Sequence, residues 1–357
     1  MLLCNDELVN QLNKFSKRPA GKAFSKDSVF LNDAELDASV IIPCYNSQDY
    51  LEKCLDSVLN QKTHCTYEVI AVNDGSCDST PQILARYQES YKQLVVVNQE
   101  NKGFSGARNA GIRVSKGRFL VFIDSDDYVE GDYIENLVGT AKKKNLDLTA
   151  CGYMTFRDSN VIKRVSVRGD HDQTLLNGCF WAKAFKREIF NHIVFPEGYW
   201  YEDSILAHLI YPQITSFASV DGCFYAYRSN ENGITISSRG KAKSIDTFYV
   251  SDLMIDSVIE CLGENQIRTQ EYYELILEQF YLNQSRVKEL DDCIQRLIFK
   301  AQSDFVKTYY KDKSTEKWKY KKFQDSLRNN DYKGCKKQIK LEKLYKVIEL
   351  LTRKFGN

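Results

Sequence analysis

The sequence lacks any apolar run that could cross a bilayer, since no stretch reaches the ~18 consecutive apolar residues that a membrane-spanning helix requires. The opening stretch, MLLCNDELVNQLNK, also lacks the basic flank and apolar core of a secretory signal, and it carries acids at Asp6 and Glu7 instead. These absences predict a soluble protein that is not exported. We therefore expect a cytoplasmic location.

Cysteine and histidine occur without the spacing of a metal site or a disulfide framework. The 11 Cys residues are odd in number, run from Cys4 to Cys335 and include no CxxC pair, and the 4 His residues form no metal-binding pattern either. We therefore expect reduced thiols and no zinc centre. The glycine-containing stretch NKGFSGARNAG, residues 101–111, matches neither GxGxxG nor GxxxxGK[ST], which disfavours a dinucleotide or P-loop site.

The charge is close to balanced over the 357 residues but uneven along them. The formal net charge is +1, yet residues 307–357 hold 16 Lys or Arg against 6 Asp or Glu, a net charge of +10. Such a basic, aromatic tail suits contact with the anionic inner leaflet of the cytoplasmic membrane. A solvated basic face or a homo-oligomer contact is an equally open interpretation, and no nucleic acid is expected because no recognition module is visible.

Strands and helices alternate regularly from residue 38 onward. Val- and Ile-rich runs predict strands at 38–42, 67–73, 94–98 and 118–124, and apolar residues at helical spacing predict helices at 50–61, 79–91 and 105–115. This alternation predicts an α/β fold with a mostly parallel, Rossmann-like sheet sandwiched by helices. We expect an N-terminal extension at 1–37, a catalytic domain at 38–236 and a smaller helical domain with the basic tail at 237–357.

Polar clusters follow several of the predicted strands, at the edge of the sheet where α/β proteins bind ligands. Within DSDD, Asp124 and Asp126 can project to one side of an extended segment and Asp127 to the other. Protonation, an Arg or Lys partner, or a divalent cation such as Mg²⁺ would relieve their repulsion. Alternatively, Asp126 or Asp127 caps a helix that starts near Gly131. Asp74, in NDGS, either forms a turn or holds a base or ribose.

A further cluster, GYWYEDSILAHL, places Glu202 and Asp203 directly after three aromatic residues. Rings around a carboxyl group would desolvate it and raise its pKa toward that of a general base. The alternative is a helix cap, with Asp203 starting a helix that runs through Tyr211. Arg108 is a partner either for the acidic cluster or for a ligand phosphate.

Taken in order, PCYN, NDGS, GARN, DSDD and the Glu202-Asp203 pair resemble the motifs of family 2 glycosyltransferases with the GT-A fold. The resemblance covers about residues 38–236. It implies an inverting transfer from a nucleotide-diphosphate sugar, most often a UDP-sugar, with Mn²⁺ or Mg²⁺.

The resemblance also implies a role for individual residues. The residues implied to bind the nucleotide are Pro43, Tyr45, Asn46, Asp74, Arg108, Asp124 and Ser125. Asp126 would bind the metal with help from Asp124 or Asp127, Asp203 would be the catalytic base, and Glu202 would orient the acceptor. The segment YAYRSNENGITIS resembles a late family motif, which implies that Arg228 and Thr235 close over the diphosphate. Trp200 and Tyr201, the rings next to Glu202, offer a surface on which a sugar of the acceptor could stack.

The sequence lacks the QxxRW motif of processive synthases, so we expect transfer of one or a few sugars to a glycan, a lipid-linked acceptor or a protein-linked acceptor. Such a reaction belongs to the assembly of surface polysaccharide or glycoprotein glycans. Two alternatives stay open: a nucleotidyltransferase on the same sheet, and a non-catalytic partner subunit that only binds nucleotide or glycan.

Overall fold

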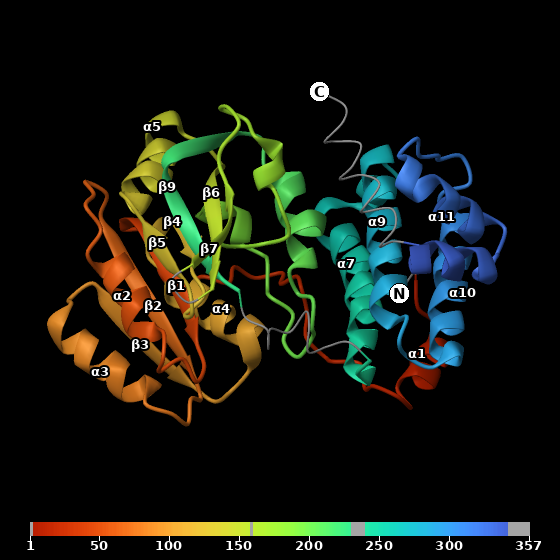
Figure 1. The fold of residues 1–357 in the computed structure, drawn as a ribbon, viewed down its shortest axis with the longest axis horizontal. Helices are drawn as coiled ribbons and strands as arrows, with labels where there is room; N and C mark the ends of the chain where they lie inside the picture. Colours follow the sequence, from red (N-terminus) through yellow and green to blue (C-terminus); the bar gives the residue numbers. More distant parts are fainter. Residues whose placement is uncertain (1–2, 158–159, 230–239, 342–357) are drawn as a thin grey trace. The chain divides into compact units, whose positions relative to one another are not determined.

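The structure is a computed structural model that describes residues 3–157, 160–229 and 240–341. The chain divides into two compact units. Unit 1 combines Met1–Arg18 with Asn232–Asn357, and unit 2 is Pro19–Glu231. Within the described residues, unit 2 holds one nine-stranded sheet with order β3-β2-β1-β4-β8-β6-β9-β5, and β7 pairs with β6 (Figure 1).

The first half of unit 2 is the predicted alternation of strands and helices. Its elements are β1 (Leu36–Cys44), α2 (Leu51–Leu59), β2 (Tyr67–Asp74), α3 (Thr80–Ser90), β3 (Leu94–Gln99), α4 (Gly103–Val114) and β4 (Gly117–Phe122). All three pairings among these strands, β1 with β2, β1 with β4 and β2 with β3, are parallel. The α/β class and the parallel sheet expected for this region are therefore confirmed.

Helices cover both faces of these parallel strands because alternate residues of β1 are apolar on both sides. Val40 and Ile42 are fully buried in one core cluster together with α2 and with Leu84 of α3. On the opposite face, α4 packs so closely that a Cβ atom on Gly111 would lie 2.5 Å from Ile41 Cγ2. The parallel strands therefore end at a common edge between two helical layers, and that edge is where the polar clusters lie.

The second half of unit 2 is mixed rather than parallel. Its strands are β5 (Tyr128–Glu130), β6 (Leu148–Arg157), β7 (Asn160–Val165), β8 (Lys183–Lys186) and β9 (Phe217–Arg228). Its helices are η1 (Glu135–Gly139), α5 (Thr140–Lys144), η2 (Gln173–Leu175), η3 (Arg187–Phe190), η4 (Leu206–Ile210) and η5 (Tyr211–Gln213). Strand β8 runs antiparallel to both β4 and β6, and thus joins this half to the parallel half.

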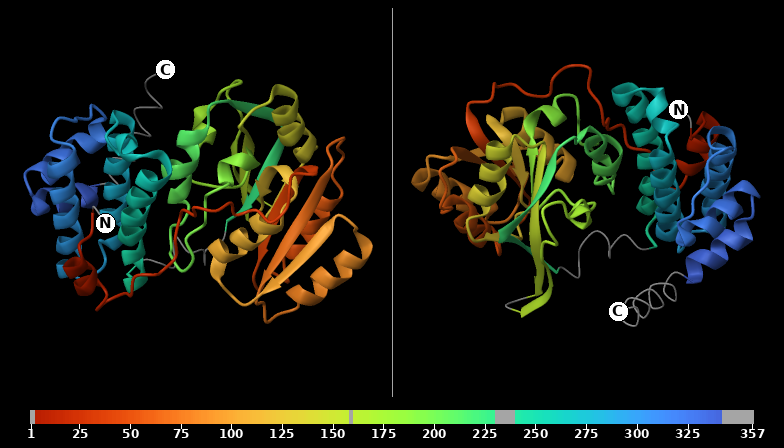
Figure 2. Two further views of the ribbon diagram at one scale, coloured as in Figure 1. Left: turned by 180° about the vertical axis from the view of Figure 1, so that it is seen from behind. Right: turned by 90° about the horizontal axis from the view of Figure 1, so that it is seen from above.

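Unit 1 is helical, as the apolar spacing beyond residue 240 predicts. It contains α1 (Asp6–Leu12), η6 (Ala242–Ile245), α7 (Asp246–Leu262), α8 (Glu264–Ile267), α9 (Gln270–Val287), α10 (Asp292–Tyr309) and α11 (Trp318–Arg328), followed by helical residues 332–341. The N-terminal helix α1 lies beside α10, so the two ends of the chain contribute to one unit (Figure 2). None of the helices in the described ranges is both long and apolar enough to span a bilayer.

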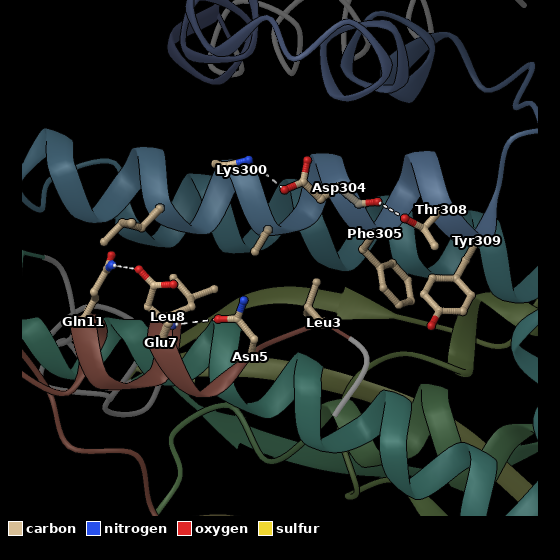
Figure 3. A pocket seen from close by; sticks show the side chains of 12 residues that line it. Leu3, Asn5, Glu7, Leu8, Gln11, Lys300, Asp304, Phe305, Thr308 and Tyr309 are labelled. Carbon is tan, nitrogen blue, oxygen red and sulfur yellow. Dashed lines mark hydrogen bonds and ion pairs between the residues drawn. The ribbon is translucent and has the colours of Figure 1, made fainter.

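A hollow of about 390 Å³ lies between α1 and α10 (Figure 3). Its polar side chains are bonded to one another or to nearby backbone. Lys300 donates to Asp304 Oδ2 at 2.9 Å, and Thr308 Oγ1 donates to the Asp304 carbonyl at 2.8 Å. On α1, Gln11 donates to Glu7 Oε1 at 3.3 Å. The charges that line this hollow are therefore largely satisfied within the chain.

Candidate active site

Four of the residues implied to bind the nucleotide line one pocket of about 250 Å³ at the carboxyl ends of the parallel strands. They are Pro43, Tyr45, Asp74 and Ser125, and the remaining lining residues are Cys44, Asn101, Gly103, Phe104 and Ala107. They follow or end β1, β2, β3 and β4, so sheet topology brings them together from four separate stretches of sequence. With exposed rings at Tyr45 and Phe104 and a carboxylate at Asp74, the pocket can stack against a base and accept hydrogen bonds from it.

The carboxylate of Asp74 is fixed before any ligand arrives. Its Oδ1 atom accepts hydrogen bonds from Gln99 Nε2 at 2.6 Å and from the Lys102 backbone N–H at 2.8 Å, and the residue is only 2% exposed. Gly75, which follows it, has φ +71°, and a Cβ atom there would lie 2.9 Å from the Asn101 nitrogen. The turn is therefore specific for glycine, and it holds Asp74 at the pocket wall.

Asn46, also implied to bind the nucleotide, does not line this pocket. Its Oδ1 atom accepts from the Cys77 N–H at 2.9 Å, and its own N–H donates to Ser76 Oγ at 3.1 Å. Its backbone is left-handed, with φ 48°, a conformation that Asn tolerates better than most residues. Asn46 therefore joins the loops after β1 and β2 and shapes the pocket indirectly.

The acidic loop after β4 divides its three carboxylates between the interior and the surface. Asp127 is 2% exposed, and its two oxygens accept from the Tyr225 hydroxyl at 2.7 Å and from the Arg228 N–H at 2.7 Å. Because both partners lie on β9, Asp127 anchors the loop to that strand. Both carboxylate oxygens of Asp127 are thus engaged by β9 and not by the helix after Gly131, and its assistance to a metal ion stays a prediction.

Asp124 and Asp126 remain partly exposed on the other side of the loop. Burial and, second, the charge of Asp124 raise the pKa of Asp126 to about 6. Burial and the charges of Asp124 and Asp126 raise the pKa of Asp127 as well. The loop thus concentrates negative charge that the chain only partly compensates, and a bound cation would relieve the repulsion.

The buried guanidinium of Arg108 compensates part of the negative charge of the acidic loop. Arg108 lies on α4 with a side chain that is 7% exposed; Nη1 donates to Glu202 Oε1 at 2.9 Å, and Nη2 lies 3.5 Å from Asp124 Oδ1. Phe180 and Phe195 pack against the guanidinium, with ring centroids 5.4 and 5.6 Å from Cζ. Arg108 does not line the nucleotide pocket; it connects the acidic loop to the Glu202-Asp203 pair.

The segment that contains Glu202 and Asp203 turns at Tyr201, whose φ is 68°. The Leu206 N–H donates to the Asp203 carbonyl at 3.0 Å, so Asp203 stands at the start of the predicted helix. Its side chain is exposed rather than enclosed by rings, which differs from the expectation of a desolvated base. One of the three rings is directed elsewhere, because the Tyr199 hydroxyl donates to the Pro19 carbonyl at 2.9 Å.

Trp200 and Tyr201 are both partly exposed, and their rings meet edge to face with centroids 6.4 Å apart. They provide an apolar surface next to Asp203. Such a surface suits a sugar ring, and the implied contact with the acceptor stays a prediction.

Arg228, at the end of β9, lies against the acidic loop, and its implied role in closing over the diphosphate stays a prediction. Its Nε atom donates to the Asp126 carbonyl at 2.8 Å, and its guanidinium lies over the Tyr50 and Phe156 rings at 4.1 and 4.7 Å. This places a fixed positive charge beside Asp126. The other residue of that motif, Thr235, lies outside the described residues.

One structural feature beside the acidic loop was missed from sequence, namely residues 177–183, which lead into β8 and include its first residue. Lys183 is 1% exposed, and its Nζ atom donates to Asn177 Oδ1 at 3.0 Å and to the Cys179 carbonyl at 2.8 Å. Burial lowers the pKa of Lys183 to about 8. Trp181 stacks on Tyr225, with centroids 4.8 Å apart and planes inclined by 9°. This segment therefore packs directly against the tyrosine that holds Asp127.

Phe104 and Asn101, which also line the pocket beside Asp74, were not among the residues expected from sequence. Both lie just after β3, and the rule that ligands bind where parallel strands end would have included them.

The residues present fit a divalent cation only in part. Among the described residues no group of three or more His, Cys, Asp or Glu side chains is arranged to hold a metal ion. Asp126 and Asp124 are nevertheless exposed enough to bind one, and Mg²⁺ commonly takes one or two carboxylates together with phosphate oxygens of a substrate. The donor set therefore fits a cation that is completed by a nucleotide diphosphate rather than a site built by protein alone.

A parallel half of the sheet, with a pocket and an acidic loop where its strands end, is the arrangement expected of the GT-A fold. The same fold occurs in the crystal structure of TarS residues 1–349 from S. aureus, which aligns with a TM-score of 0.68 at 18% identity and covers 86% of this chain and 92% of that one. The expected fold class is therefore confirmed.

Residues 39–198 match the family model described as Glycosyl transferase family 2, so the protein carries a glycosyltransferase domain of this family. GlyA of Streptococcus pneumoniae serotype 4 is 29% identical over 217 residues, which are 55% of this chain and 31% of GlyA. EpsJ of Bacillus subtilis, an uncharacterised glycosyltransferase, is 30% identical over 215 residues, 55% of this chain and 62% of EpsJ. The chain thus spans between about one third and two thirds of the length of these two relatives.

Proposed function

We propose that the protein transfers a sugar from a UDP-sugar to a hydroxyl group of an acceptor, with inversion at the anomeric carbon. The observation that carries this proposal is the pocket lined by Pro43, Tyr45, Asp74 and Ser125, which opens beside the acidic loop. The crystal structure of TarS in complex with UDP-GlcNAc supports the choice of donor, since TarS shares the fold.

The nucleotide would bind with its base against Tyr45 and Phe104 and with hydrogen bonds to Asp74. This orientation directs the diphosphate toward Ser125 and the acidic loop, because Ser125 borders both. Ser125 Oγ is already 2.7 Å from Ser47 Oγ, so its position is fixed from the loop after β1. The chain's own contribution at this stage is orientation of the donor.

Asp126, with Asp124, would hold Mn²⁺ or Mg²⁺, which when bound neutralises charge on the diphosphate leaving group. Arg228 adds a positive charge of the chain itself at the same loop, and its ring contacts limit its movement. Asp127 supports both by fixing the loop to β9. Arg228 directly, and the aspartates through the cation they hold, would stabilise the negative charge that develops on the diphosphate as the bond between sugar and phosphate breaks.

Asp203 would act as general base and remove the proton from the acceptor hydroxyl as that oxygen attacks the anomeric carbon. Its exposed carboxylate can reach an acceptor, and Arg108 fixes the neighbouring Glu202 at 2.9 Å. A single base and direct attack from the face opposite the diphosphate invert the anomeric centre. Glu202 is better placed to position this segment than to accept the proton, because its carboxylate is paired with Arg108.

The acceptor would be a glycan, a lipid-linked saccharide or a protein-linked glycan that receives one or a few sugars during assembly of surface polysaccharide or glycoprotein. Trp200 and Tyr201 supply the apolar surface against which such a sugar packs. A peripheral contact with the inner membrane leaflet and a homo-oligomer both stay predictions.

The proposal is tested by incubating the protein with a panel of UDP-sugars and Mn²⁺ or Mg²⁺, and by measuring UDP release together with the mass of the product. UDP release with one donor, abolished in Asp203→Asn, is the expected result. Release of pyrophosphate instead would indicate a nucleotidyltransferase. Binding of UDP-sugars without turnover, with every acceptor class supplied, would indicate a subunit that only binds nucleotide.

A further inference from the structure

A second hollow in unit 1, of about 470 Å³, has a strongly basic lining. It lies between the start of α10 and helical residues 332–341. Its cations are Arg296, Lys333, Lys336, Lys337 and Lys340, and the other lining residues are Asp292, Tyr332 and Leu341. Five cations therefore face a single carboxylate, in contrast to the hollow between α1 and α10, where Lys300 and Asp304 are paired.

The single carboxylate, that of Asp292, already accepts three hydrogen bonds. Asp292 accepts from Arg296 Nε at 2.6 Å, from Lys336 Nζ at 2.5 Å and from the Tyr332 hydroxyl at 2.8 Å. The Phe299 ring packs against Tyr332 with centroids 5.5 Å apart, which fixes the floor of the hollow. Asp292 thus organises two of the cations and has little remaining capacity to neutralise the other three.

The other three cations are Lys333, Lys337 and Lys340. All three are exposed, and among the residues that the structure describes no salt bridge is formed by any of them. Their spacing of four and three residues places them on one face of the helix, over a length of about 10 Å. A row of solvated ammonium groups beside a preorganised Arg-Lys pair suits several phosphate groups presented side by side, more than one small anion.

We propose that this basic hollow and the helix face around it dock on the phosphate headgroups of an anionic bilayer. The sequence that follows supports a bilayer, because residues 343–355, KLYKVIELLTRKF, combine seven apolar or aromatic residues with four basic ones and a single acid, a composition typical of segments that bind a membrane interface. The proposal does not rest on sugar transfer, and vesicle binding and UDP release are separate measurements.

The test compares flotation of the full chain with vesicles of phosphatidylcholine alone and with vesicles that contain one-third phosphatidylglycerol, at about 0.1 M salt. We expect binding only to the anionic vesicles. Each lysine near such a surface contributes about fivefold in affinity, so Lys333→Ala, Lys337→Ala and Lys340→Ala together should weaken binding by about 100-fold. The three corresponding Arg substitutions should retain it.

A matched control removes the same charge from unit 2, with Lys92→Ala, Lys143→Ala and Lys144→Ala, all at exposed positions. This control should bind vesicles as the unaltered chain does, and circular dichroism should show that both triple variants are folded. Equal loss in the two variants, or no loss in the first, would refute the docking surface.

Two further results would also overturn the proposal. Displacement from vesicles by inorganic phosphate, but not by sodium chloride of equal ionic strength, would assign the hollow to a single small anion. Tighter binding to an RNA homopolymer than to anionic vesicles, lost in the same triple variant, would assign it to nucleic acid.

Discussion

Replacing Arg108 by Met should show how strongly the candidate site depends on one buried cation. The side chains of Arg108 and Glu202 are only 7% and 14% exposed, so their contact counts as buried, whereas Asp124, 31% exposed at 3.5 Å, contributes little. Breaking a buried pair by removing one partner costs about 3–5 kcal/mol, because the remaining charge is left uncompensated. Met retains part of the volume between Phe180 and Phe195, so we expect a loss near 3 kcal/mol.

The assay is urea unfolding of the full chain, followed by the fluorescence of Trp181 and Trp200, which lie in unit 2. A double-mutant cycle separates charge from packing: with Glu202→Gln already present, Arg108→Met should cost about 2 kcal/mol less than it does alone. Arg113→Met, at an exposed position of the same helix, is the matched control and should change the free energy of unfolding by no more than about 0.5 kcal/mol. An additive cycle, or an Arg108→Met variant as stable as the control, would refute the reasoning.

Three other predictions concern the proposed chemistry and the buried histidine of unit 2. Asp203→Asn should lower the rate of transfer by about 100-fold or more while UDP-sugar affinity, measured by calorimetry, is unchanged; turnover near that of the unaltered protein would remove the general base. Asp126→Ala should weaken Mn²⁺-dependent UDP binding by about tenfold or more, whereas Asp132→Ala should not, and equal affinities would contradict the metal role. Burial lowers the pKa of His208 to about 3, so the stability it contributes is present above its unfolded pKa near 6.5 and is lost as the pH falls. Between pH 6 and pH 4 the free energy of unfolding should therefore fall by about 1.4 kcal/mol per pH unit more steeply than in His208→Leu, and parallel profiles would show that His208 does not titrate on unfolding.

The parallel half of the sheet could be predicted from sequence because its strands are rich in apolar residues and the first three, β1, β2 and β3, are each followed by an amphipathic helix. Strand β7 could not be predicted, since Asn160–Val165 is largely exposed and its buried and exposed residues do not alternate. Strand β8 was missed for the opposite reason. It begins at Lys183, which is buried as an ammonium group among carbonyl oxygens, and no hydrophobic period places a lysine in the interior.

The candidate site was predicted where residues directly follow strands, as at Asp74 and Ser125. The different roles of the three carboxylates in the acidic loop could not be predicted, because the sequence DSDD does not show which of them hydrogen-bonds to β9. The sequence distance of about 100 residues between Asp127 and Tyr225 explains why: that hydrogen bond depends on how β9 enters the sheet. Long-range contacts of side chains are set by topology, and the local pattern does not encode them.

The inward orientation of Asp127 means that two adjacent, chemically identical residues should tolerate different replacements. Lengthening Asp126 to Glu leaves a carboxylate on the open side of the loop, where an extra methylene can be accommodated. The same change at Asp127 has to be fitted between a tyrosine hydroxyl and a backbone amide, each 2.7 Å away. A substitution of Asp127 would therefore affect catalysis mainly through the conformation of the loop, whereas a substitution of Asp126 would leave that conformation unchanged.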